Sequence, residues 1–539
     1  MSHQRRPSDF SIFMSRLRRT PWRKAIRQAW RARGRDDELL LPERLEGAVY
    51  GHLCGDALGV PYEFTPASAI GKVEWRGHGT HDQPAGTWSD DGALMLALLD
   101  SLLETGFDPA DQGRRALAWF DEGRYAVGGL VFDVGTSTIS ALHALRSGTP
   151  AEEAGSAEAR GNGALMRILP LPLVLRQADD VELVEKATRA ARVTHGSAEA
   201  QLACALYALV VRRLLAGEED RVRALAEARM ALRTYLGSAG LPGSKEAAAR
   251  LEAVAQLDAF EAWAERRASG RVVDSFWSAW DAFAGAADYR SAVVAAVEYG
   301  GDTDTTSAIA GGLAGVYFGI ESIPTAWHRG LRDRRLAQML VDRLVESDTS
   351  EWGGARWSTS SADPLPLDEL DLDGTELGSD GGRAGMTFLP GKRYLGYYSG
   401  PQWRDLDSDL ATLREAGVDL LLLLVEDHEL ERCGVIHIDE AMADYGIELV
   451  RHPIRDPMTP YDDAAYRATI RASAQRVRAG AALAIACRGG LDRAGMTSAC
   501  LLREAGLDAS TAIDRVHAAR RHTLTMPDQL EYVRGWPHA

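Results

Sequence analysis

The feature that most restricts the fold of this chain is a long stretch, residues 45–347, in which apolar residues recur at helical spacing. No segment of this stretch shows the clear alternation of β-branched residues that is typical of strands. One helix is predicted over residues 198–215 and another from Ser89, each with one apolar face. On the first helix that face carries Leu202, Leu206, Leu209 and Val210. The pattern predicts a single all-α domain over residues 43–347.

The composition of the chain changes after this stretch. Residues 348–385 are rich in glycine, serine, proline and acidic residues, which predicts a linker. Two short apolar runs follow, residues 420–425 and 481–486, and both are predicted strands. Helical segments separate or follow them, at residues 408–416, 461–479 and 494–505. Strands that alternate with helices predict a smaller α/β domain with a mainly parallel sheet over residues 386–539.

The charge and cysteine content exclude several classes of protein. The 539 residues include 61 Lys and Arg against 77 Asp and Glu, which argues against a broad nucleic-acid-binding surface. The longest uncharged run of apolar and small residues, residues 307–320, is too short to span a bilayer, so we expect no membrane insertion. Five cysteines are too few for a disulfide framework in so long a chain, which favours a reducing cytoplasm.

The N-terminal segment, residues 1–42, is a basic arm. Up to Arg35 it holds eleven Lys and Arg but a single acid, Asp9. We favour a poorly ordered or marginal basic helix that folds back on the acidic body of the protein. A secretory signal peptide is not favoured because no long apolar core follows the charges, whereas composition leaves a transit peptide open.

Two short acidic motifs each open a predicted helix: residues 86–92 (Gly-Thr-Trp-Ser-Asp-Asp-Gly) and residues 300–306 (Gly-Gly-Asp-Thr-Asp-Thr-Thr). Carboxylates and hydroxyls with few histidines or thiols suit Mg²⁺ or Mn²⁺ rather than zinc. Four carboxylates converging from two helix starts could hold two such ions, and would repel one another without a cation. The alternative is that Ser89 and Asp302 are simply helix N-caps, with the acids placed near helix dipoles.

Further motifs accompany the acidic pair in a fixed order. They are Gly47-Ala48, residues 55–59 (Gly-Asp-Ala-Leu-Gly) with Glu63, residues 133–135 (Asp-Val-Gly), residues 161–167 (Gly-Asn-Gly-Ala-Leu-Met-Arg) and residues 194–196 (Thr-His-Gly). With both acidic motifs, this series resembles the ADP-ribosylglycohydrolase family over residues 43–335. That family comprises the dinitrogenase-reductase-activating and the arginine- or serine-ADP-ribosyl hydrolases.

The resemblance implies a helical bundle with two Mg²⁺ ions, for which Mn²⁺ could substitute. By motif position the ligands would be Ser89, Asp90, Asp91, Asp302, Asp304 and Thr305, and the ions would engage the ribose hydroxyls and orient a water. Asp133 and Glu63 are candidates for acid–base chemistry at the glycosidic bond. Gly161, Asn162 and Gly163 would let the backbone approach a pyrophosphate or ribose closely. His195 is interpreted as a packed or substrate-positioning residue. This chain has Ser89 where threonine is common, and Gly92 where a threonine often follows the paired acids.

The second domain contains a cysteine loop at residues 487–493 (Cys-Arg-Gly-Gly-Leu-Asp-Arg) between a predicted strand and a helix. Such a loop can direct backbone N–H groups and a helix N-terminus at a phosphate. The same dipole and Arg493 would lower the pKa of Cys487 and make it a nucleophile. Arg493 could hold two phosphoryl oxygens, and Asp456 could protonate the leaving oxygen. The alternative is a buried cysteine at a strand end beside an unrelated arginine.

This loop, together with Leu389-Pro390-Gly391 and residues 499–502 (Ala-Cys-Leu-Leu), resembles the cysteine-dependent dual-specificity and tyrosine phosphatases over residues 386–536. The likeness is greatest to the cyclin-dependent-kinase-inhibitor-3-like branch. Ala486 and Ala494 depart from that pattern, and Asp492 is expected to place a carboxylate near the phosphate and to weaken turnover. Cys433 and Cys500 are interpreted as core residues.

The leading hypothesis is a two-domain enzyme. A Mg²⁺-dependent hydrolase would remove ADP-ribose from protein side chains, arginine favoured, and a thiolate phosphatase would act on a phosphorylated substrate. Two alternatives remain: a hydrolase of free ADP-ribosyl or phosphorylated nucleotide metabolites, and an ADP-ribose hydrolase or binding protein whose second domain only binds phosphate. ADP-ribosylated proteins or ADP-ribose derivatives are the expected partners, with no nucleic acid and no membrane.

Overall fold

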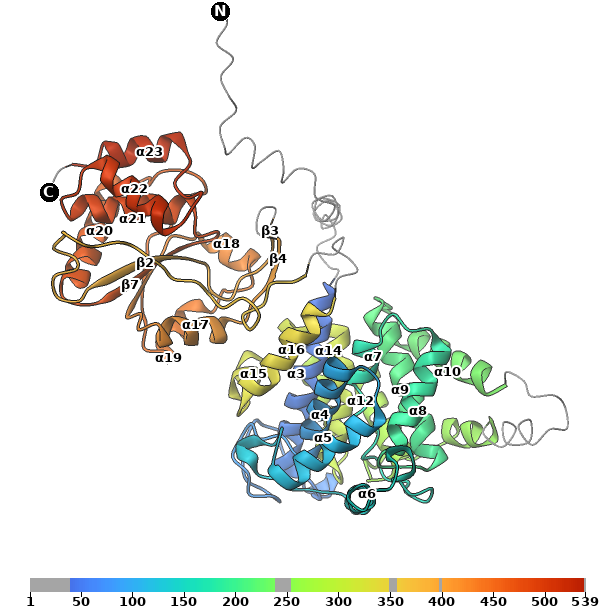
Figure 1. Cartoon of the computed structure of the whole chain (residues 1–539). Helices are drawn as coiled ribbons and strands as arrows, with labels where there is room; N and C mark the ends of the chain where they lie inside the picture. Colours follow the sequence, from blue (N-terminus) through green and yellow to red (C-terminus); the bar gives the residue numbers. More distant parts are fainter. Residues whose placement is uncertain (1–38, 238–253, 349–355, 397–399, 538–539) are drawn as a thin grey trace, which may run out of the picture. The chain divides into compact units, whose positions relative to one another are not determined.

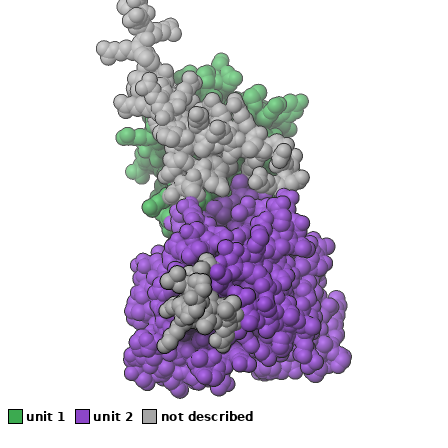
Figure 2. All heavy atoms as spheres, turned by 90° about the vertical axis from the view of Figure 1, so that its right-hand side faces the viewer, with its two compact units in different colours: residues 1–34, 348–539 green, residues 35–347 purple. Residues whose placement is uncertain are grey.

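The computed structural model of the chain describes residues 39–237, 254–348, 356–396 and 400–537. The predicted basic arm, residues 1–42, therefore lies almost entirely outside the described residues. The chain divides into two compact units, one of residues 35–347 and one that contains residues 348–539 (Figure 2). Among the described residues, no helix combines the length and the apolarity needed to cross a membrane.

The larger unit consists of helices and loops over its described residues, with only isolated β-bridges, which confirms the predicted all-α class (Figure 1). The helix predicted over residues 198–215 is α9, and the one predicted from Ser89 is α4, with Ser89 as its N-cap. The α-helices with both bounds among the described residues are α3 (Leu41–Gly59), α4 (Asp90–Thr105), α5 (Pro109–Glu122), α6 (Thr136–Arg146), α7 (Pro170–Val174), α8 (Asp180–Arg192), α9 (Ala198–Leu215), α10 (Arg221–Gly237), α12 (Val272–Gly285), α13 (Tyr289–Glu298), α14 (Thr303–Phe318), α15 (Thr325–Gly330) and α16 (Arg334–Glu346).

Helices α3 and α14 pack backbone against backbone because small residues line both facing surfaces (Figure 1). The contact is made by residues spaced four apart on each helix: Gly47, Gly51, Gly55, Gly311 and Gly315. A methyl group at Gly315 would overlap the carbonyl oxygen of Gly47, so larger side chains would push the helices apart. At the end of this contact Gly59 lies against the backbone of Asp304. The end of α3 and the start of α14 are therefore held together.

The smaller unit contains a five-stranded sheet in the order β1-β2-β7-β5-β6. Its strands are β1 (Asp368–Glu369), β2 (Arg383–Phe388), β5 (Leu420–Leu423), β6 (Glu448–Arg451) and β7 (Ala482–Cys487). All neighbours pair in parallel except β1 with β2, which confirms the predicted mainly parallel sheet. A separate antiparallel pair is formed by β3 (Arg393–Gly396) and β4 (Gly400–Trp403).

Helices cover both faces of this sheet, which explains why β5 and β7 are apolar along their whole length (Figure 1). One face packs on α20 (Asp463–Arg478), α21 (Asp492–Glu504), α22 (Ala509–Ala519) and α23 (Pro527–Arg534). The other face packs on α17 (Leu406–Glu415), α18 (Asp427–Arg432) and α19 (Ile438–Asp444). The predicted core cysteines lie one on each side, Cys500 in the first cluster and Cys433 in the second.

The structure differs from the predicted linker, residues 348–385. Strand β1 and the first residues of β2 lie within this segment, and Leu370, Leu372 and Leu377 are part of the core of the smaller unit. Trp357 packs edge-on against Trp403 at 5.9 Å between ring centroids. Scattered leucines in a glycine- and acid-rich background hid this burial, because each apolar side chain is separated from the next by polar residues. Residues 356–385 thus belong to the folded unit.

Candidate active sites

The acidic site of the helical unit forms where α3, α4 and α14 meet. From α3, Asp56 accepts hydrogen bonds from the backbone N–H groups of Ser89 (2.9 Å) and Gly92 (2.8 Å), which fixes the start of α4. The Ser89 hydroxyl accepts from the Asp91 N–H at 3.2 Å, so this serine does act as an N-cap. Asp302 makes no capping bond to α14. The N-cap interpretation therefore describes Ser89 and not Asp302.

The acids of the two motifs come together in the structure. Asp90, Asp91 and Asp304 are buried, and the Thr305 hydroxyl donates to Asp91 Oδ2 at 3.2 Å, which joins the two helix starts. Burial raises the pKa of each of these three carboxyl groups well above its usual range, and the neighbouring carboxylates raise it further. Burial also raises the pKa of Asp302. Four carboxyl groups thus share a small, poorly solvated volume in which their ionised forms are disfavoured unless a cation compensates them.

This donor set fits a divalent cation. Asp91 Oδ1 and Asp304 Oδ2 are buried and have no hydrogen-bond partner among the residues that the structure describes. Oxygens of Glu63, Asp302 and Asp304 lie within 4.8 Å of one another. Unpaired buried carboxylate oxygens are costly, and oxygen atoms are the ligands that Mg²⁺ and Mn²⁺ prefer. The arrangement is therefore that of a binding site for a hard cation and not that of an ordinary protein core.

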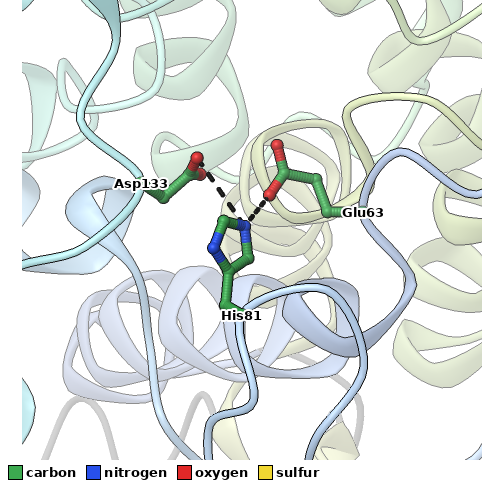
Figure 3. Close-up of side chains that lie close together, drawn as sticks. All are labelled: Glu63, His81 and Asp133. Atoms are coloured by element: carbon green, nitrogen blue, oxygen red, sulfur yellow. Dashed lines mark hydrogen bonds and ion pairs between the residues drawn. The ribbon is translucent and has the colours of Figure 1, made fainter.

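A second cluster joins Glu63, His81 and Asp133 (Figure 3). His81 Nε2 forms a hydrogen bond with Glu63 Oε2 and lies 3.7 Å from Asp133 Oδ1. Burial raises the pKa of Glu63 to about 10, and the charges of Asp133, Asp302 and Asp91 contribute. The sequence interpretation missed His81, because a single histidine in a glycine- and proline-rich loop carries no periodic signal. Its position upstream of the first acidic motif, in a long loop, was the available hint.

Backbone pairing places Glu63 beside the second acidic motif. The N–H of Phe64 donates to the Gly301 carbonyl at 2.7 Å, and the N–H of Gly301 donates to the Thr65 carbonyl at 3.1 Å. The loop that follows Glu63 is thereby fixed to the residue before Asp302. Two segments far apart in the sequence, one predicted catalytic and one predicted metal-binding, share one site.

The residues predicted to contact a ligand, Gly161 to Gly163 with His195, form a packed corner. A methyl group at Gly163 would lie 2.8 Å from His195 Cε1, so the absence of a side chain at Gly163 leaves space for the His195 imidazole. Burial lowers the pKa of His195 to about 3, and Nδ1 lies 3.0 Å from the Thr194 hydroxyl. Asn162 Nδ2 donates to Asp302 Oδ2 at 2.8 Å. Asn162 thus orients a predicted metal ligand.

In the smaller unit, Cys487 ends β7 and Arg493 lies in the first turn of α21. Gly490 has a φ of +66°, and a methyl group there would lie 2.6 Å from the Thr387 carbonyl oxygen, so the loop requires glycine. Cys487 and Arg493 are 3% and 1% exposed. The loop is therefore compact and closes over the carboxyl end of β2.

Arg493, which is predicted to bind phosphate, pairs with an acid of the same unit. Its Nη1 and Nη2 donate to the two oxygens of Glu429, at 2.7 and 2.9 Å, and only Nε faces Asp456 Oδ1, at 3.4 Å. Glu429, on α18, was not singled out from the sequence because acids are frequent in exposed first turns. Asp456 is also paired with Arg488 at 2.6 Å, so the predicted acid does lie at the loop.

Asp492 does not face the loop as predicted. Its Oδ1 accepts hydrogen bonds from the Thr525 N–H (2.8 Å) and the Thr525 hydroxyl (3.0 Å). The carboxylate is thereby tied to the segment before α23. The expected repulsion between Asp492 and a bound phosphate has no support in this geometry, because the side chain has a structural partner elsewhere.

Family models match segments of both units. Residues 36–353 match the family model of ADP-ribosylglycohydrolase, and residues 384–513 match the model of cyclin-dependent kinase inhibitor 3. The chain is 30% identical over 318 residues to ADP-ribosylarginine hydrolase Tri1 of Pseudomonas putida (strain GB-1), covering 57% of this chain and 80% of that protein.

Two solved structures are similar to one unit each. An ADP-ribosylglycohydrolase-related protein complex has 33% identity and a TM-score of 0.46, covering 56% of this chain and 97% of its own. A kinase-associated phosphatase has 22% identity and a TM-score of 0.29, covering 32% of this chain and 92% of its own. The family model that covers more than half of the sequence decides the assignment: the chain belongs to the ADP-ribosylglycohydrolase family and carries a cyclin-dependent-kinase-inhibitor-3-like domain after it.

Proposed function

We propose that the helical unit is a Mg²⁺-dependent hydrolase that removes ADP-ribose from modified arginine side chains of proteins. The observation that carries this proposal is the pair of unpartnered buried oxygens, Asp91 Oδ1 and Asp304 Oδ2, within a cluster of acids. The likeness to an ADP-ribosylarginine hydrolase supports arginine as the acceptor. A cation would compensate the charge that burial otherwise makes costly.

Two Mg²⁺ ions, or Mn²⁺ in their place, would be held by Ser89, Asp90, Asp91, Asp302, Asp304 and Thr305. When bound, the ions would act as Lewis acids that bind the ribose hydroxyls and lower the pKa of a water molecule. Asn162 would keep Asp302 in place through its 2.8 Å hydrogen bond, and Asp56 would keep the start of α4 in place. Neither of these two supporting residues needs to contact the substrate.

Hydrolysis of the C1″–N bond adds a water hydroxyl to C1″, releases the water's second proton and delivers one proton to the leaving nitrogen. Glu63 and Asp133 are the candidate groups for these proton transfers, and His81 holds their carboxyl groups near one another. Glu63 is 3% exposed whereas Asp133 is half-buried, so Asp133 has the easier exchange of protons with solvent.

We further propose that the smaller unit hydrolyses phosphate esters through Cys487. The thiolate would form an S–P bond as the ester P–O bond breaks, with Asp456 protonating the leaving oxygen. Water would then release inorganic phosphate. The placement of Cys487, Arg493 and Asp456 at one loop supports this reaction. The ion pairs of Asp456 with Arg488 and of Arg493 with Glu429 have to open before these groups can bind the substrate. We expect slow turnover for that reason.

One substrate panel tests the first proposal. The full chain is incubated with peptides ADP-ribosylated on arginine, serine or cysteine and with ADP-ribose-1″-phosphate, each with and without Mg²⁺. We expect Mg²⁺-dependent release of ADP-ribose from the arginine peptide. Activity on ADP-ribose-1″-phosphate alone would instead establish a metabolite hydrolase. The matched control is Asp281→Asn, an exposed acid of α12 paired with Arg266, which should retain activity that Asp304→Asn loses.

A further inference from the structure

The cysteine loop of the smaller unit has a buried cation beneath it that the reaction proposed above does not use. Lys392 follows Gly391 in the segment between β2 and β3, and its side chain is almost fully buried, at 3% exposure. It is the only lysine among residues 246–539, where every other strongly basic side chain is an arginine. Lysine presents a compact charge, and burying it requires a compensating partner.

The position of the Lys392 ammonium group is given by two contacts. Its Nζ lies 3.4 Å from the carbonyl oxygen of Arg488 and 4.0 Å from the centre of the Phe388 ring. Arg488 is the residue after Cys487, and Phe388 is the direct partner of Cys487 in the pairing of β2 with β7. Both contacts are made with residues next to Cys487, one in the chain and one in the sheet, so the ammonium group lies at the cysteine loop.

The other cations of this region each have a carboxylate partner. Arg404 is paired with Asp409, Arg493 with Glu429 and Arg520 with Asp368, each at 2.7 Å. Lys392 forms no ion pair with any carboxylate of the described residues, and its carbonyl contact is long. Among these described cations, Lys392 is thus the one without a carboxylate partner, and it contacts the backbone of the cysteine loop.

Burial lowers the pKa of Lys392 to about 8, and the charges of Arg404 and Arg520 contribute, so the amine is still mainly protonated at neutral pH. The groups that act in the opposite direction are the thiols of Cys433 and Cys487. Burial raises the pKa of Cys433 to about 11, which keeps that thiol neutral. Cys487, at the end of β7, is the other thiol that interacts with the Lys392 ammonium group.

We propose that Lys392 is a positioning residue that stabilises the thiolate of Cys487 as a buried ammonium–thiolate pair. The inference rests on the proposed role of Cys487 as nucleophile. In this pair the thiol proton passes to solvent and the ammonium keeps its own. Arg493 acts in the same direction, whereas Glu429 and Asp456 oppose it and are themselves paired with Arg493 and Arg488. Lys392 lies beneath the loop and acts through the sulfur without touching substrate.

The test is the pH dependence of alkylation of Cys487 by iodoacetamide in the full chain, followed by mass spectrometry of the cysteine-containing peptide. Lys392→Met removes the charge and keeps a long unbranched side chain that suits a buried position. Arg414→Met, an exposed cation of α17, is the matched control. Thermal unfolding of each variant shows that the unit is folded, and p-nitrophenyl phosphate hydrolysis gives kcat and KM.

In the wild-type protein we expect the alkylation midpoint of Cys487 well below the roughly 8.5 of a free thiol. Lys392→Met should raise that midpoint by at least one pH unit, which slows alkylation at pH 6.5 about tenfold, and should lower kcat more than it changes KM. Arg414→Met should leave the midpoint unchanged. A low midpoint that Lys392→Met does not move overturns this inference and leaves the nucleophile intact. An ordinary midpoint in the wild-type protein overturns both.

Discussion

Replacing Asp304 by asparagine separates the charge repulsion within the acidic cluster from the hydrogen bond that Asp304 accepts at the start of α14. Asparagine keeps the Oδ1 acceptor that receives the Thr305 N–H at 2.9 Å, so the start of α14 is preserved. The substitution removes one negative charge that faces Glu63, Asp133, Asp302 and Asp91. In a chelated buffer we therefore expect the variant to unfold at the same or a higher temperature than the wild-type protein at pH 8.

The pH dependence of the cation-free protein follows from the raised carboxyl pKa values. A carboxyl group whose pKa is higher in the folded state stabilises the fold below its unfolded pKa and loses that contribution as pH rises. For Asp56 the window runs from about 4 to about 7, and for Glu63 it extends to about 10. Keeping Asp56 ionised above pH 7 costs about 4 kcal/mol relative to the unfolded chain. The helical unit should thus be less stable at pH 8 than at pH 5.

Adding Mg²⁺ should reverse this loss. A ligand present at a hundred times its Kd stabilises the folded state by about 2.7 kcal/mol, which raises the melting temperature of a unit this size by about 5 °C. We expect that shift in the wild-type protein at pH 8, a smaller shift at pH 5, and little shift in Asp304→Asn. Differential scanning fluorimetry over a MgCl2 titration measures it, with Asp281→Asn as the charge-matched control. A Mg²⁺ shift of equal size in Asp304→Asn, or none in the wild-type protein, would refute the cation site.

Three other perturbations test separate parts of the structure. Gly315→Ala should destabilise the helical unit by about 1–3 kcal/mol, since its methyl group would meet the backbone of α3; a melting temperature equal to that of the wild-type protein would contradict the packing argument. Cys487→Ser should abolish hydrolysis of p-nitrophenyl phosphate, and Asp456→Asn should slow it, whereas unchanged rates in both would leave the loop as a binding site. Asp492→Gly should lower the melting temperature of the smaller unit because it removes two hydrogen bonds with Thr525. Its phosphatase activity should not rise, whereas a rise would be expected if the Asp492 carboxylate repelled the bound phosphate.

Much of the fold could be predicted because its signals are local. The apolar face of residues 198–215 and the acidic start at Ser89 specify α9 and α4 without reference to the rest of the chain. The apolar runs in β5 and β7 indicated strands covered on both faces. The linker prediction was wrong for residues 356–385 because their leucines are isolated in the sequence and come together only where they pack against the sheet.

The candidate sites were predicted in part for the same reason. Asp90, Asp91, Asp302 and Asp304 are recognisable because each pair lies in a short motif at a helix start. His81, Glu429 and Lys392 have no such neighbours in the sequence. Each contacts a residue brought from another segment, namely Glu63, Arg493 and Arg488.

The sequence by itself determined the residue types at both sites, the two classes of domain and the elements that carry the chemistry, because periodicity and short motifs are properties of neighbouring residues. Only the tertiary structure decided where each side chain is directed. Asp492 is bonded to Thr525 instead of facing the loop, Arg493 is held by Glu429, and Gly163 makes room for His195. These outcomes depend on which surfaces are buried together, since a buried polar group takes whichever partner the packing brings within hydrogen-bond distance.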